Sequence, residues 1–112
     1  MNQEKQRIAI AEACGYSNCH WRGPADFREF VGKRILEGGE IYPGCRVPDY
    51  LNDLNAIHEA VETLRHKDGS EWWDFRVHLA DICGSAGNCI QATAAQRAEA
   101  FLKTLGLWTE EE

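Results

Sequence analysis

Two segments with helical periodicity and clear start signals limit what this 112-residue chain can fold into. In Val47–Leu64, Pro48 suits the first turn of a helix, and Asp49 suits the positive end of the helix dipole. In Ala92–Trp108, Thr93 and Gln96 predict a capping box. Helical spacing predicts the core-facing side chains Tyr50, Leu54, Ile57, Val61 and Leu64 in the first segment and Ala94, Ala98, Phe101, Leu102 and Leu105 in the second.

A third helix is expected at the start of the chain, over Asn2–Cys14. Asn2 is a suitable N-cap, and Gly15 suits a C-terminal stop. A fourth is expected over Ser70–Cys83, where the alternation of Phe75–Leu79 also fits a strand. We favour the helix there, because the run is long and Ser70 is a good cap.

The rest of the chain predicts short strands and turns. Ser17–Arg22 alternates, and Asn88–Ala92 is another candidate strand. The sequence does not decide whether the glycine-rich segment Gly23–Arg46 acts as a lid. Within this segment we expect three elements. They are a short helix over Phe27–Leu36, a strand at Glu40–Tyr42 and a turn at Pro43-Gly44.

These elements together predict a single α+β domain. The expected architecture is a small sandwich of about four helices around a short antiparallel sheet, and one core suffices for this length. A net charge of −6, with basic residues scattered among acids, argues against binding a nucleic acid polymer. A few arginines in one pocket still permit a small anionic ligand.

The expected location is the cytosol, with no contact with a membrane. No segment approaches eighteen consecutive apolar residues, and the N-terminal residues do not have the pattern of a signal peptide. The odd number of cysteines, five, argues against a fully paired disulfide framework. Buried thiols are the simplest interpretation. The alternative is a zinc site using Cys14, Cys19, His20 and Cys45, but the spacings match no compact zinc knuckle. No cofactor or metal is therefore expected.

Several of these segments also carry a family resemblance. The motifs PDYLNDLNAIHEA (Pro48–Ala60) and ATAAQRAEAFL (Ala92–Leu102) occur together with AEACGY (Ala11–Tyr16) and a following Trp21. With these motifs the chain resembles the phage ABA sandwich domain family. The resemblance implies helices flanking a small sheet and an accessory protein of a bacteriophage or prophage, placed in the host bacterial cytosol. It brings no catalytic residues with it.

The polar and aromatic residues within these motifs are candidate ligand-binding residues. Tyr50 would stack on a ring, Asp53 would accept hydrogen bonds from hydroxyls or amines, and Arg97 would bind a phosphate. Backbone N–H groups after Thr93 would add an anion-binding helix end. The structural alternative places Tyr50 in the core, pairs Asp53 with Arg97 and leaves Thr93 as a cap only.

Tryptophans add two further candidates, Trp21 and Trp73. Adjacent Trp72 and Trp73 point about 100° apart on a helix, so one of them is expected at the surface, where indoles often mark contacts. Trp21, on a predicted strand, also fits a core position.

Catalytic motifs are absent from the sequence. It has no H-E-x-x-H, Walker loop, G-x-G-x-x-G or G-x-S-x-G, which disfavours an enzyme. We expect a non-enzymatic binder that sequesters a small nucleotide-derived molecule, such as a host immune signal. The alternative is an interaction module that binds a host or phage protein, and a metal-dependent nucleotide hydrolase is a distant third. Under the first two interpretations we expect a homo-oligomer.

Overall fold

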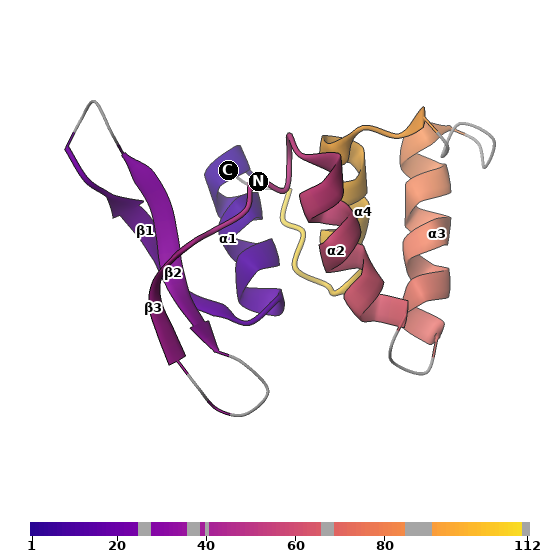
Figure 1. The fold of residues 1–112 in the computed structure, drawn as a ribbon. Helices are drawn as coiled ribbons and strands as arrows, with labels where there is room; N and C mark the ends of the chain where they lie inside the picture. The colour runs from indigo at the N-terminus through magenta and orange to yellow at the C-terminus, as the bar shows by residue number, and fades with distance from the viewer. Residues whose placement is uncertain (25–27, 36–38, 40, 66–68, 85–90, 111–112) are drawn as a thin grey trace.

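The computed structural model describes residues 1–24, 28–35, 39, 41–65, 69–84 and 91–110. Within these residues the chain forms four α-helices and a three-stranded antiparallel sheet, which confirms the α+β prediction (Figure 1). The elements are, in chain order, α1 (Gln3–Ala13), β1 (Tyr16–Arg22), β2 (Glu29–Ile35), β3 (Ile41–Arg46), α2 (Leu54–Arg65), α3 (Ser70–Cys83) and α4 (Ala94–Thr104).

The helices all lie on one side of the sheet. In Figure 1, α1 lies next to the strands, α2 and α4 follow, and α3 is farthest from the sheet. Helix α1 contacts both β1 and α4, so it joins the sheet to the other helices. None of the helices in the described part of the chain is long and apolar enough to cross a membrane.

The core is centred on α4. This helix contacts α1, α2 and α3. The largest side chains that are fully buried come mainly from three helices: Phe101, Ile10, Ile57, Leu64, Leu102 and, from the sheet, Val31. The apolar faces predicted for the segments that form α2 and α4 therefore meet in one core.

The middle strand corrects one prediction. The helix expected over Phe27–Leu36 is wrong, because Glu29–Ile35 forms β2, which pairs with β1 on one side and β3 on the other. Trp21 pairs with Phe30, and Gly32 with Cys45. Backbone bonding to two neighbours overrides the local helical spacing. Of the predicted helix, residues 27 and 36 lie outside the described residues.

Strand β3 is longer than the sequence predicted and crosses the Pro43-Gly44 position expected as a turn. Glu40 lies outside the described residues. A register shift accompanies this passage, and Gly44 has φ +72°. An edge strand tolerates proline at such an irregularity, because one side of its backbone needs no partner.

Helix α2 begins later than predicted. The N–H of Val47 donates to the carbonyl of Phe30 at 2.9 Å, which ties the start of the segment to the sheet and keeps Pro48 out of the helix. Asp53 caps the helix instead: its carboxylate accepts from the N–H of Asn55 at 2.9 Å. Ile57, Val61 and Leu64 are buried as expected, but Leu54 in the first turn is 54% exposed.

The other three helices follow the predictions closely. The side chain of Asn2 caps α1, and the reciprocal bonds between Thr93 and Gln96 confirm the capping box of α4. Residues 70–83 are helical, which settles the choice between helix and strand, but Ser70 is the first helical residue rather than the cap. In the candidate strand Asn88–Ala92, residues 88–90 lie outside the described residues, and Gln91 and Ala92 are not in a strand.

Candidate functional site: two clefts around Arg7

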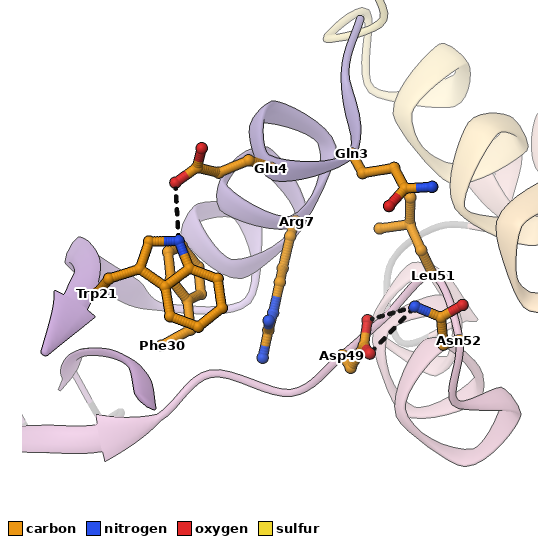
Figure 2. A pocket seen from close by; sticks show the side chains of 8 residues that line it. All are labelled: Gln3, Glu4, Arg7, Trp21, Phe30, Asp49, Leu51 and Asn52. Atoms are coloured by element: carbon orange, nitrogen blue, oxygen red, sulfur yellow. Dashed lines mark hydrogen bonds between the residues drawn. The ribbon is translucent and has the colours of Figure 1, made fainter. Parts of the chain in front are cut away.

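Two adjoining clefts open between α1, the sheet and the segment that leads into α2. Their volumes are about 350 and 440 Å³, and both are lined by Arg7, Trp21, Phe30 and Asp49. We call them the Arg7 clefts; Figure 2 shows the smaller. The smaller cleft is also lined by Gln3, Glu4, Leu51 and Asn52, and the larger by Arg28, Glu29, Arg46, Val47 and Pro48. Cavities of several hundred Å³ are typical of small-molecule sites.

Arg7 on α1 lines both clefts. Its Nε donates to the carbonyl of Pro48 at 2.9 Å, and its Nη2 donates to the carbonyl of Val47. The guanidinium carbon lies 4.7 Å from the centroid of Phe30. In Figure 2, Arg7 extends between the two aromatic rings and Asp49. The residue therefore fixes α1 against the connecting segment and keeps a positive charge at the cleft wall.

Trp21 provides an indole that is partly open to the clefts. Its ring centroid lies 5.1 Å from that of Phe30, and its Nε1 donates to a carboxylate oxygen of Glu4 at 3.1 Å. The guanidinium of Arg28 lies 5.6 Å from the indole centroid. The residue nevertheless remains 42% exposed, which departs from the core position that a strand residue suggested. Its orientation is thus fixed while part of its surface remains available.

Charged groups of both signs border the larger cleft. The carboxylate of Glu29 accepts from Arg46 at 2.9 Å and from Arg22 at 3.4 Å. These two guanidinium groups, Arg46 first, lower the pKa of Glu29 below its ordinary value. The carboxylate of Asp49 accepts from the side-chain amide of Asn52. The surroundings of Arg7 therefore combine an aromatic surface, guanidinium donors and a carboxylate acceptor.

Two of the six predicted ligand-binding residues line the Arg7 clefts or a third cleft. Trp21 lines the Arg7 clefts, whereas Tyr50, only 3% exposed, lines a smaller and separate cleft. Trp73 lies on α3 and is 62% exposed, so it is the surface indole of the Trp72-Trp73 pair. The structure thus does not place these residues around one cavity.

The other three predicted residues lie at helix starts. Asp53 caps α2, and Thr93 caps α4. The Nε of Arg97 donates to the carbonyl of Ala92 at 3.2 Å, beside that second cap. Local capping therefore accounts for Asp53 and Thr93 without a ligand. The structural alternative supposed this role for Thr93, whereas it paired Asp53 with Arg97 instead of making it a cap.

Sequence reasoning did not select Arg7 or Phe30 as site residues, and it preferred to interpret Asp49 as a helix-start residue. A signal for Arg7 was present: it precedes the buried Ile10 and Ala11 by three and four positions, which places a charge on the apolar face of α1. Such a charge needs partners, and two backbone carbonyls provide them. Phe30 escaped notice because β2 was expected to be a helix.

Cys14 and Cys19, next to and in the sheet, are free thiols. Cys14 and Cys19 are half-buried, and burial is the main cause that raises the pKa of each thiol. The Nδ1 of His20 lies 2.7 Å from the carbonyl of Asn18. Within the described ranges, no group of three or more His, Cys, Asp or Glu side chains is placed to hold a metal ion. The zinc alternative gains no support from this arrangement.

Comparisons with protein-family models, with curated proteins and with solved structures found no match to this chain. The resemblance to phage ABA sandwich proteins therefore stays a prediction from the sequence motifs. The function is therefore inferred from the side chains that line the Arg7 clefts.

Proposed function

We propose that this protein is a phage accessory protein of the host cytosol that binds and sequesters a small nucleotide-derived molecule without transforming it. The observation that carries the proposal is the pair of adjoining Arg7 clefts, which share a partly exposed indole, a guanidinium and a carboxylate. A nucleotide offers the matching groups: a base to stack, phosphates to pair with guanidinium groups and hydroxyls to donate to a carboxylate.

Specific residues suit each part of such a ligand. Trp21 would stack on the base, and Asp49 would accept from a sugar hydroxyl. Arg28 and Arg46 would bind phosphates, since both line the larger cleft and both are exposed; Arg46 would use the N–H donors that its ion pair with Glu29 leaves over. Arg7 is less suited to this role, because two backbone carbonyls already hold its guanidinium.

The two half-buried thiols near the sheet are poorly suited to nucleophilic catalysis. A cysteine with a raised pKa is a weak nucleophile at neutral pH, and this applies to both Cys14 and Cys19. The resemblance to phage ABA sandwich proteins supplies the setting, in which removal of a host immune signal would benefit the phage.

A titration with a panel of nucleotides and cyclic dinucleotides tests this proposal. We expect the melting temperature to rise with the concentration of at least one member, and calorimetry to give its Kd. In Trp21→Ala, loss of about 1–3 kcal/mol of stacking should weaken binding by about 5- to 150-fold. Trp73→Ala also removes an exposed indole, but it lies on α3 and should leave the Kd unchanged.

The proposal fails if no member of the panel binds, or if Trp21→Ala and Trp73→Ala have equal effects. Recovery of the bound ligand after denaturation distinguishes sequestration from hydrolysis. An intact ligand supports sequestration, whereas a cleaved one contradicts it.

The exposed face of α3 around Trp73 and Val77 is a candidate contact surface for the expected homo-oligomer and for the interaction-module alternative. Trp73 and Val77, one turn apart on α3, are both more than half exposed. Helical geometry places Asp74 and Asp81 along one flank of this pair and Arg76 along the other. We infer that a second copy binds here about a two-fold axis parallel to α3. That symmetry would bring the acidic flank of each copy against the basic flank of its partner.

Light scattering after size-exclusion chromatography tests this surface. The unmodified protein should have the mass of a dimer, and Trp73→Ala should shift the mass towards that of the monomer, because it removes the largest apolar side chain of the face. Trp21→Ala is the matched control and should leave the mass unchanged. A monomeric unmodified protein would rule out this dimer.

A further inference from the structure

A separate cleft of about 130 Å³ lies between α2 and the sheet. Of the described residues that line it, Pro48 alone also lines one of the Arg7 clefts. Part of its lining comes from α2, part comes from β1 and β2, and Tyr50 and Cys14 complete it. A water molecule takes about 30 Å³ in the liquid, so the space suits a ligand about as large as four water molecules.

The α2 wall is open because it is built from small residues. Ala56 and Ala60 are one turn apart, and neither has a side chain beyond Cβ. Glu59 lines the cleft next to them. Within the described residues, the carboxylate of Glu59 has neither a hydrogen bond nor an ion pair. A negative charge therefore borders this side of the cleft without a protein partner.

The sheet wall carries the opposite charge. Arg34 on β2 lines the cleft, and its guanidinium lies 5.5 Å from the ring centroid of Tyr16, the residue it pairs with across the sheet. Stacking of this kind orients a guanidinium while leaving its N–H donors available. In the described part of the chain, Arg34 has no carboxylate partner.

Tyr50 and Cys14, which also line the cleft, are polar but neutral. Burial is the main cause that raises the pKa of both the Tyr50 hydroxyl and the Cys14 thiol, so neither carries a charge at neutral pH. Tyr50 and Cys14 also lie close enough together to influence each other's pKa. Among the described lining residues, Arg34 and Glu59 are thus the two that carry charge.

We propose that this cleft binds a small zwitterion of the α-amino acid class, with its carboxylate on Arg34 and its ammonium group on Glu59. A simple anion would be repelled by Glu59, and a simple cation by Arg34. A molecule that carries both charges a few ångströms apart satisfies both walls at once. The small volume favours glycine, alanine or serine over larger members of the class.

Nuclear magnetic resonance titration with L-alanine tests the proposal. We expect saturable shifts of backbone amide signals around Tyr50 and Glu59. Acetate and methylammonium, which each carry one of the two charges, should bind at least about tenfold more weakly, because each loses one charge-assisted hydrogen-bonding partner. Equal binding of alanine and acetate would instead indicate a plain anion site and would overturn the proposal.

Matched variants separate binding from folding. Arg34→Gln and Glu59→Gln should each weaken alanine binding by about tenfold or more. Lys33→Gln, one position away on β2, and Glu62→Gln, one turn along α2 where the carboxylate is paired with Arg65, should leave it unchanged. Unchanged binding in both cleft variants, with their spectra still native, would refute the assignment. This site is independent of the nucleotide proposal, because the ligand and the variants differ.

Discussion

Replacing Phe101 by alanine is expected to lower the free energy of unfolding by about 3–5 kcal/mol, because it leaves a cavity in the core. Phe101 is fully buried on α4, the helix that contacts all three others. Domains of this size are stable by only about 5–15 kcal/mol, so the variant would lose a large share of its stability. Urea unfolding followed by circular dichroism measures the change.

Phe101→Leu is the control for this prediction. It keeps most of the apolar volume, so its cost should stay below about 1.5 kcal/mol. The slope of the free energy with urea must be similar in both variants for the comparison to hold. A loss of less than about 1 kcal/mol in Phe101→Ala would contradict the central position of α4 in the core.

Arg7→Ala is expected to cost about 2–3 kcal/mol of stability and to weaken ligand binding in the Arg7 clefts, because the connecting segment that carries Asp49 loses its attachment to α1. Each of the two charge-assisted hydrogen bonds contributes about 1.5–3 kcal/mol. Because Arg7 is only half-buried, water can replace some of the lost bonding in the variant, so the expected loss is smaller than the full sum. The substitution leaves the carbonyls of Val47 and Pro48 without their donors and removes the cation over Phe30. Chemical denaturation and nucleotide titration report the two effects separately.

Two further substitutions on α1 sharpen this prediction. Arg7→Lys keeps the charge but not the planar fork, so it should recover only part of the stability. Lys5→Ala changes an exposed residue of the same helix and should alter the free energy of unfolding by no more than about 0.5 kcal/mol. If Arg7→Ala and Lys5→Ala had equal effects, Arg7 would not join α1 to the connecting segment.

Local signals made the helices predictable. The capping box at Thr93 and the N-cap at Asn2 each involve residues only three positions apart, so the sequence alone contains the interaction. Strand β2 and the start of α2 were not predictable in this way. Both depend on pairing with distant residues, as in the hydrogen bond between Val47 and Phe30. Hydrophobic spacing carries no information about such partners.

The same difference between short-range and long-range contacts explains which residues of the candidate site were predictable. Composition and spacing singled out Trp21, but the cleft around it depends on Arg7, whose two carbonyl partners lie 40 and 41 positions along the chain. Conversely, Asp53 and Thr93 attracted attention as polar residues in recognisable motifs, and short-range capping explains them. A polar residue in a motif is thus a weak guide to a ligand when a helix begins beside it.

The central position of α4 also limits the order of events during synthesis on the ribosome. Helix α4 lies last among the described helices in the chain, yet α1, α2 and α3 all pack against it. The apolar faces of the first three helices therefore stay incompletely covered until residues 94–104 have emerged. Completion of the fold must then wait for these residues, and a nascent chain that stalls before them would expose the surface that chaperones recognise.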